Sequence, residues 1–411
     1  MEIRPILSAL LRNKTGPVLV AIQVALSLGI LANALHIVQV RQAVSARPTG
    51  LEREEDIFVI SVRHLKQGGH EDQLAAQRRD TSTLRAVPGV LSVSETSQMP
   101  LSRSGNYTGL AVDRKQTRTT ATSTSYNTAD SLVKTWGLKL IEGRDFYPNE
   151  VPEIDVNTSE EFPKVGIVTR TLAEKMWPGQ SSYLGKTVFF GTGDKSRSVQ
   201  VVGVVERLQT PGAQIDDTGE YSIITPARLT GTEVVAYTVR AEPGQLDRVM
   251  KETSEAIRAA SPSPVVTRTR SMIELRTDRY RADRALAWML VTVSVLLLLI
   301  TASGIVGMAS LWVTQRRKQI GVRRALGARR VDILRYFITE NFMITSTGVA
   351  AGLLIALGLN QLLVSQLEMP RLPAGYLLGG AAIFWALGVM AVYGPAWRAA
   401  SISPATATRS A

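Results

Sequence analysis

The sequence has no cysteine among its 411 residues and only three histidines. Disulfide bonds, thiol nucleophiles and cysteine-ligated metal sites are therefore excluded. The histidines, His36, His64 and His70, do not have the spacing of metal ligands. The G-x-S-x-G motif of serine hydrolases is also missing, so nucleophilic hydrolysis has no assembled residues. We predict no catalytic residue, cofactor site or metal site, and we expect that the chain alone is not an enzyme.

One segment imitates a phosphate-binding loop but has the wrong spacing. That loop needs four residues between its two glycines and a helix after its lysine. In residues 179–187 (GQSSYLGKT), five residues separate Gly179 from Gly185, and the following KTVFF favours a strand. We therefore predict a turn at Gly185 that leads into a strand, without a bound nucleotide.

Charge is nearly missing from four apolar stretches, residues 16–38, 286–313, 337–364 and 374–396. Each exceeds the roughly 20 residues that cross a hydrocarbon core about 30 Å thick. A buried soluble helix explains one such stretch, whereas four of them favour membrane insertion. Glu340 is the charged residue inside these stretches, and we expect it to be hydrated near the interface. An ion-coupled transporter would need more intramembrane charge than this.

The first stretch follows Arg4, Arg12 and Lys14, as the apolar core of a cleavable signal peptide would. Its apolar run of about 22 residues is longer than the about 7–15 residues of such a core. A small-residue pattern near Ala46 keeps cleavage as the alternative. We expect an uncleaved membrane anchor.

Basic residues predict the orientation. Segment 315–336 is rich in lysine and arginine, whereas the short loop 365–373 contains only Arg371. Because short cytoplasmic loops carry the excess of basic residues, both termini and segment 315–336 are expected in the cytoplasm. Much of the net charge of +12 has this origin, so no nucleic-acid partner is expected.

These observations predict an α-helical membrane protein with four transmembrane helices and a large α+β periplasmic domain inserted between the first and second helices. The predicted segments are a cytoplasmic N-terminal segment (1–15), transmembrane helix 1 (16–38), the periplasmic domain with stalk helices (39–284), transmembrane helix 2 (286–313), a cytoplasmic loop (314–336), transmembrane helix 3 (337–364), a short periplasmic loop (365–373), transmembrane helix 4 (374–396) and a cytoplasmic tail (397–411).

The external domain has an internal pattern. Residues 57–95 and 232–266 each read as strand, helix, strand. Two such units around a central insertion predict one subdomain built from both ends and an insert subdomain at about 130–225. Residues 268–284 contain no glycine or proline and predict a helix that runs into the second span. Together with residues 39–46 it would form a stalk.

Small residues recur every four positions in two of the apolar stretches, at Ala21, Ala25 and Gly29 and at Gly348, Gly352 and Ala356. Such faces allow two helices to approach closely. Dimerisation and packing within one subunit explain them equally well.

Segment 315–337 (QRRKQIGVRRALGARRVDILRYF), which covers most of the predicted cytoplasmic loop, mixes apolar and basic residues. We predict a helix that ends at Gly327 and a second short helix before the membrane, because glycine commonly follows a helix C-terminus. The pattern suits anchoring to anionic lipids or docking of a cytoplasmic partner. The candidate coupling residues are Arg316, Arg317, Ile320, Gly321, Arg323, Arg324, Ala325, Leu326, Gly327, Ala328, Val331, Ile333 and Leu334.

This loop resembles the hallmark of the FtsX-like permease family, specifically its MacB-type members, which are mechanotransmitting (type VII) ABC transporters. The family pattern R-x-x-E-I-G-[IV]-R-[RK]-A-[LIV]-G-A is matched from Arg316 to Ala328 and is followed by Ile333. Gln319 departs from it, because the family usually has glutamate there.

Other stretches extend the resemblance over nearly the whole chain. Pro395 and residues 398–405 match the C-terminal signature of the family. Segments 138–146, 177–188 and 199–208 resemble the MacB-like periplasmic core domain. The resemblance implies a stand-alone permease in the bacterial inner membrane, without a fused ATPase domain.

The resemblance also implies the partners and the function. Two permeases, identical or paralogous, would pair on a separate cytoplasmic ABC ATPase dimer, which would bind ATP and Mg. A periplasmic adaptor (membrane fusion protein) and an outer-membrane channel would be further partners. The permease would relay ATPase motion to its periplasmic domain for efflux or extraction of a substrate from the periplasm or outer leaflet. The alternatives are an FtsX-like regulator of cell-wall hydrolases and a lipoprotein-releasing permease.

Overall fold

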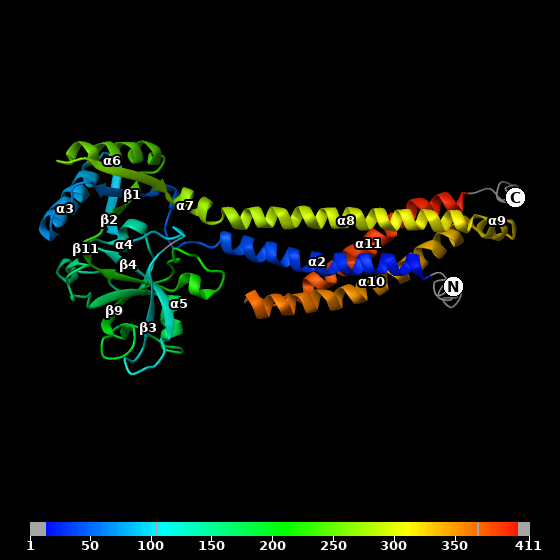
Figure 1. The fold of residues 1–411 in the computed structure, drawn as a ribbon, viewed down its shortest axis with the longest axis horizontal. Coiled ribbons are helices and arrows are strands. Elements are labelled where there is room, and N and C mark those ends of the chain that lie inside the picture. The colour runs from blue at the N-terminus through cyan, green and yellow to red at the C-terminus, as the bar shows by residue number, and fades with distance from the viewer. Residues whose placement is uncertain (1–13, 104, 368–369, 402–411) are drawn as a thin grey trace. The chain divides into compact units, whose positions relative to one another are not determined.

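The computed structural model describes residues 14–103, 105–367 and 370–401 and consists of two compact units (Figure 1). One is an α/β unit, Val44–Ala282, and the other is a helical unit formed by the chain on either side of it. Most of the predicted N-terminal segment and tail, and residues 368–369 of the short loop, lie outside the described residues.

The helical unit has four helices that are long and apolar enough to cross a membrane, as predicted. They are α2 (Thr15–Ser45), α8 (Arg281–Gln315), α10 (Arg330–Leu367) and α11 (Ala374–Ala400). Each continues beyond its apolar stretch into flanking polar residues, which favour helix as well. A shorter helix, α9 (Arg317–Ala325), lies between α8 and α10.

The small-residue faces pack against each other within the chain. A side-chain carbon placed on Gly348 would lie 2.7 Å from the carbonyl oxygen of Ala21, and one on Gly352 would lie 3.0 Å from that of Ala25. Asn33 of α2 donates to the carbonyl oxygen of Ala356 on α10 at 3.0 Å. The stripes therefore let the backbones of α2 and α10 approach closely, which favours packing within the subunit over dimerisation as their role.

The α/β unit begins and ends with a four-stranded antiparallel sheet, in the strand order β13-β1-β12-β2. Its elements are β1 (Ile57–His64), α3 (His70–Ala86), β2 (Val90–Thr96), β12 (Val235–Ala241), α6 (Leu246–Ala260) and β13 (Val265–Ser271). The two predicted strand-helix-strand units are confirmed, and their strands interleave as in the split β-α-β motif. Helices α3 and α6 pack on this sheet around Leu84 and Val249.

Strands β1 and β13 bring the two ends of the α/β unit together. In their antiparallel pairing, Phe58 near the start of β1 lies opposite Ser271 at the end of β13. This pairing corrects the prediction of a helix over 268–284. The β-branched residues before Met272 complete the strand instead. The helix α7 (Met272–Arg279) starts after the Ser271 cap and ends at Tyr280, where α8 follows.

The insert forms a second sheet, in the order β5-β9-β7-β10-β4-β3-β8, with a further pairing between β8 and β9 that closes most of it into a ring. The strands are β3 (Tyr107–Ala111), β4 (Ala121–Thr128), β5 (Leu140–Gly143), β7 (Val165–Thr169), β8 (Thr187–Phe190), β9 (Arg197–Val205) and β10 (Ser222–Pro226). This closed sheet begins at Tyr107, earlier than residue 130, because β4 pairs with β10.

Shorter elements complete the α/β unit. They are α4 (Leu132–Trp136), α5 (Arg170–Met176), β6 (Glu153–Asp155), β11 (Arg228–Thr230) and the 3₁₀ turns η1 (Glu54–Asp56), η2 (Pro148–Glu150) and η3 (Asp217–Glu220). Strands β6 and β11 pair as a separate two-stranded sheet.

The segment that imitates a phosphate-binding loop is a turn, as predicted. Gly179 and Gly185 have φ values of +74° and +75°, which glycine adopts at little cost. Strand β8 follows Lys186 in place of the helix that a phosphate-binding loop needs.

A buried tryptophan joins the two sheets. Trp136 of α4 is fully buried, and its indole N–H donates to the hydroxyl of Thr238 on β12 at 2.8 Å. The ring of Tyr126 on β4 meets Trp136 edge-on, with centroids 5.4 Å apart. The insert is thus fixed to the four-stranded sheet by a large aromatic contact whose polar atom is satisfied.

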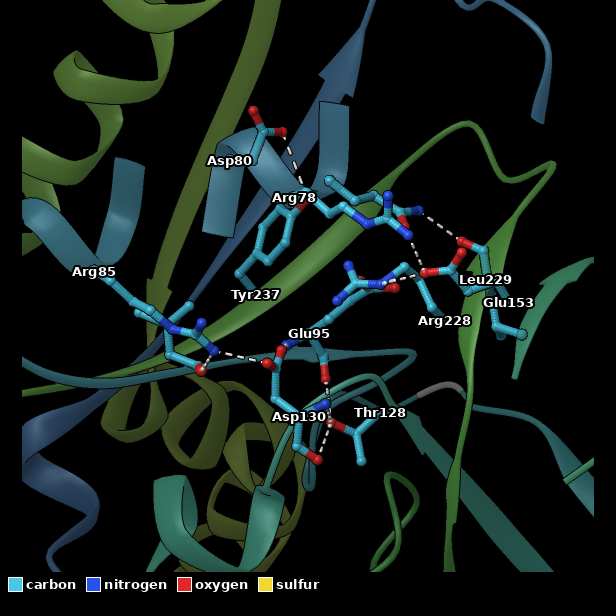
Figure 2. A network of polar contacts seen from close by, with 12 residues as sticks. Arg78, Asp80, Arg85, Glu95, Thr128, Asp130, Glu153, Arg228, Leu229 and Tyr237 are labelled. Atoms are coloured by element: carbon cyan, nitrogen blue, oxygen red, sulfur yellow. Dashed lines mark hydrogen bonds and ion pairs between the residues drawn. The ribbon is translucent and has the colours of Figure 1, made fainter. Parts of the chain in front are cut away.

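An ion-pair network lies where the chain crosses from one sheet to the other (Figure 2). Glu95 near the end of β2 is buried and pairs with Arg228 of β11 at 3.0 Å. Arg228 also approaches Glu153 of β6 at 3.8 Å, and Arg78 of α3 binds the same Glu153 carboxylate at 2.6 Å. The network therefore connects β2, where the chain leaves the four-stranded sheet, with β11, where the chain returns to it, and with β6 and helix α3.

The backbone of Glu95 is held as well (Figure 2). Its N–H donates to the carboxylate of Asp130 at 3.2 Å, and its carbonyl oxygen accepts from the hydroxyl of Thr128 at 2.7 Å. Arg85 of α3 binds Asp130 at 2.7 Å. These contacts satisfy polar groups at the edge strand β2, which would otherwise offer an open pairing site.

We predict that Glu95 makes stability depend on pH. Burial raises the pKa of the Glu95 carboxyl to about 7, an effect that Arg228 only partly offsets. A carboxyl with a raised folded-state pKa stabilises the fold below its ordinary value of 4.5 and loses this contribution as the pH rises through about 7. Glu95→Gln stays neutral at both pH values. The difference in unfolding free energy between this variant and the wild type should therefore shift in favour of the variant by on the order of 2 kcal/mol from about pH 5 to about pH 8.

Unfolding of the full chain in detergent at the two pH values measures this difference. Glu255→Gln, an exposed position on α6, is the control for removing a carboxylate. An equal effect of Glu95→Gln at both pH values would contradict the prediction.

Candidate functional site

The loop between α8 and α10 folds as helix, turn and helix, as predicted. Helix α9 ends in a Schellman motif, in which the N–H of Gly327 donates to Arg324 O at 3.2 Å and the N–H of Ala328 donates to Arg323 O at 3.0 Å. Gly327 has a φ of +95°, and a side-chain carbon placed on it would meet none of the described residues beyond its chain neighbours within 4 Å. The glycine is therefore required by the left-handed backbone and not by lack of space.

The start of α10 is capped by Asp332, a side chain of its own first turn. The N–H of Arg329 donates to the carboxylate of Asp332 at 3.0 Å. An acidic residue in the first turn also interacts favourably with the helix dipole. The direction in which the chain leaves the turn is thus fixed on both sides of Gly327.

One face of the loop is buried inside the helical unit. Ile320 of α9 and Ile333 of α10 are each 5% exposed and belong to the same apolar cluster as Phe337, Ala396 and Ala399. This burial corrects the expectation that Ile333 is available to a partner. Leu334 is half-buried against the same cluster, so it also holds the loop in place.

The opposite face is exposed and mixes apolar with basic residues. Leu326 is 83% exposed, and Val331 and Val322 are both more than half exposed. Arg317 and Arg323 are exposed as well. Of the other candidates, Ala325 and Gly327 are exposed, Arg316, Arg324 and Ala328 are half-buried, and Gly321 is buried.

Arg316 turns inward and forms an ion pair that the sequence did not predict. Its guanidinium lies 2.9 and 2.7 Å from the two carboxylate oxygens of Glu340, which is 1% exposed. Tyr336 lies 3.4 Å from the same guanidinium, and Arg323 lies over the Tyr336 ring at 5.2 Å. Glu340 is therefore paired and buried, which corrects the expectation that it is hydrated.

The available sequence signal was the isolated charge of Glu340 in an apolar stretch. Such a residue usually faces the bundle interior and has a partner. The sequence does not indicate which of several nearby arginines is the partner, because the turn at Gly327 determines which of them lies next to α10.

No group of three or more His, Asp or Glu side chains that could hold a metal ion occurs in the part of the chain that the structure describes.

We predict that the Arg316–Glu340 pair is costly to break but not to replace. Arg316→Met leaves a buried carboxylate without its partner and should destabilise the helical unit by about 3–5 kcal/mol. Arg316→Met combined with Glu340→Met removes both charges and should restore most of that loss. Thermal unfolding of the full chain in detergent measures both. A double variant no more stable than the single one would contradict a buried, mutually compensating pair.

Comparisons with known proteins match the part of the chain that contains this loop. The family model described as FtsX-like permease C-terminal matches residues 291–404, which include the whole loop. The pyoverdine export ATP-binding/permease protein PvdT of Pseudomonas syringae pv. syringae is 27% identical over 60% of this chain and 38% of the relative. The macrolide export ATP-binding/permease protein MacB of Bradyrhizobium diazoefficiens is 31% identical over 56% of this chain and 35% of the relative.

The matched region is thus less than half the length of either relative. A solved structure, the extracellular domain of the ABC-type transporter YknZ from Gram-positive bacteria, is similar over 51% of this chain and 99% of that chain. Its sequence identity is 18% and its TM-score is 0.31. Residues 291–404 therefore match the FtsX-like permease family, and the chain is similar to the MacB and PvdT export proteins over part of their length.

Proposed function

We propose that this chain is the permease subunit of an ATP-driven exporter and relays the motion of a separate ABC ATPase to its α/β unit. The observation that carries the proposal is the loop within the FtsX-like domain, which exposes Leu326 and Val331 among arginines while its other face is anchored to α11. A loop with one anchored and one exposed face is suited to receive a partner and to pass its displacement to α8 and α10.

The orientation supports the same proposal. The arginine-rich loop is placed in the cytoplasm by the positive-inside rule, next to the compartment that supplies ATP. The α/β unit, inserted between α2 and α8, then lies on the periplasmic side of the bacterial inner membrane. ATP and Mg would be bound by the ATPase dimer, and a second permease, identical or paralogous, would complete the transporter.

Export is the favoured direction because the relatives are named for export of pyoverdine and macrolides. For this chain the substrate class follows only by analogy. A periplasmic adaptor and an outer-membrane channel would receive the substrate. Co-purification with an adaptor supports export, whereas a cell-wall hydrolase or a lipoprotein in its place would favour the FtsX-like regulator or the lipoprotein-releasing permease.

We predict that the exposed apolar residues carry most of the affinity for the ATPase. Burying Leu326 or Val331 against a partner is worth about 1.5–3 kcal/mol, or roughly tenfold to a hundredfold in affinity. Exposed arginine pairs are worth about 0–1 kcal/mol and weaken with salt. Leu326→Asp and Val331→Asp should therefore each release the ATPase, while Arg329→Gln should weaken it only slightly.

Affinity of the full chain in nanodiscs for its ATPase measures this prediction. Leu334→Asp shows what a folding defect looks like in this measurement. Leu334 is half-buried, so an introduced aspartate would disturb the helical unit itself. If Leu326→Asp and Val331→Asp bind the ATPase as tightly as the wild type, the loop is a lipid anchor and the docking proposal fails.

We also predict that Gly327→Val uncouples ATPase binding from turnover. A β-branched residue at a φ of +95° is strained by about 1–3 kcal/mol, which would redirect α9 without removing an exposed contact. Gly358→Val is the matched control, because Gly358 of α10 also has open space for a side chain but an ordinary helical backbone. Permease-stimulated ATP hydrolysis should fall in the first variant and not in the second. Normal stimulation by Gly327→Val would show that the turn does not direct coupling.

A further inference from the structure

The α/β unit is joined to the helices by two chain segments. The incoming segment, residues 44–54, begins with the last two residues of α2, and the outgoing segment, residues 272–280, leads into α8. These two segments are the covalent links through which a displacement of the helices can reach the α/β unit. The contacts that they make inside the unit decide where such a displacement goes.

Arg276 of the outgoing segment holds the incoming segment. Its guanidinium binds both carboxylate oxygens of Glu54, at 2.9 and 2.7 Å. It also donates to the carbonyl oxygens of Ser45 at 2.9 Å and of Arg47 at 3.3 Å. The side chain is 18% exposed, so these charge-assisted bonds are largely shielded from water. One planar cation therefore ties the two segments together just inside the unit.

Both segments also hold one loop of the insert, residues 209–216, which we name the receiving loop. Arg47 of the incoming segment donates to the carbonyl oxygens of Gln214 at 3.3 Å and of Ile215 at 2.7 Å. Arg279 of the outgoing segment donates to those of Gly212 at 2.7 Å and Ala213 at 3.1 Å. Two arginines, one from each segment, thus bind neighbouring carbonyl groups of the same loop.

The receiving loop leads directly into the closed sheet. It follows strand β9 and precedes η3 and β10, which are both part of the insert. The segment toward β3 is attached to it as well, because the N–H of Arg103 donates to Pro211 O at 2.9 Å and the hydroxyl of Tyr107 accepts from the N–H of Gly212 at 2.9 Å. A shift of this loop would therefore act on three strands of the closed sheet, β9, β10 and β3.

We infer that Arg276 is a positioning residue that makes the incoming and outgoing segments move the receiving loop as one, so that displacement of the helices reaches the closed sheet. This inference rests on the proposed relay function and adds the residues that would carry it. Arg276→Lys keeps the charge but loses the planar fork, and its three N–H donors cannot bind both Glu54 oxygens and the two carbonyl groups together. Arg47 and Arg279 would then act on the loop independently.

The test uses the full chain with its ATPase in nanodiscs. Because the chain has no cysteine, Glu255→Cys on α6 and Lys195→Cys in the turn between β8 and β9 can carry two spin labels without background. The distance between the labels is measured with and without a non-hydrolysable ATP analogue. We expect a nucleotide-dependent change in the otherwise unaltered chain and its loss in Arg276→Lys, with ATPase binding and melting temperature retained.

Arg270→Lys is the matched control, because Arg270 forms its ion pair with Asp278 of the outgoing segment and not with the incoming one. It should keep the distance change. Arg276→Ala, if it folds, should behave as Arg276→Lys does. If the labels respond equally in the unaltered chain and in Arg276→Lys, the positioning role is refuted while the relay stands. If they do not respond even with Arg276 present and the ATPase bound, the relay itself is refuted.

Discussion

The antiparallel pairing of β1 with β13 is the constraint on which the rest of the architecture depends. A large α/β unit inserted between two apolar helices has to return the chain to the place where it left. The opposition of Phe58 and Ser271 achieves this, because the start of one strand lies beside the end of the other. The incoming and outgoing segments therefore meet inside the unit, where a single guanidinium spans both.

Two buried glutamates, one in each unit, are each stabilised by an ion pair with an arginine. Glu95 in the α/β unit and Glu340 in the helical unit are each nearly inaccessible and each paired with one arginine. A buried carboxylate without a partner would be strongly destabilising, and an arginine partner offsets this cost, although only partly at Glu95. Such pairs fix which segments lie together: Glu95 with strand β11, and Glu340 with Arg316, the residue between α8 and α9.

The sequence predicts features that depend on neighbouring residues and not those that depend on distant ones. The four apolar helices, the two strand-helix-strand units and the turn at Gly327 follow from local pattern. The burial of Ile333 depends on Ala396 and Ala399, which lie on another helix, and the strand at 268–271 depends on its pairing with β1. The partner of Glu340 likewise depends on how the loop turns back. The coupling role of the exposed loop residues stays a prediction.

The interleaved order of the four-stranded sheet has a consequence for biosynthesis. Strands β3 to β10 are contiguous in the sequence, so the closed sheet has all its strands by Pro226. The four-stranded sheet cannot be completed until β13, at Val265–Ser271, has been synthesised and has found β1. Pairing across such a sequence separation is slow, because loop closure precedes the contacts that stabilise it. Because β12 and β13 both follow the insert, the N-terminal strand β1 has both edges unpaired while the insert folds, and this interval is the one in which a chaperone would be most useful.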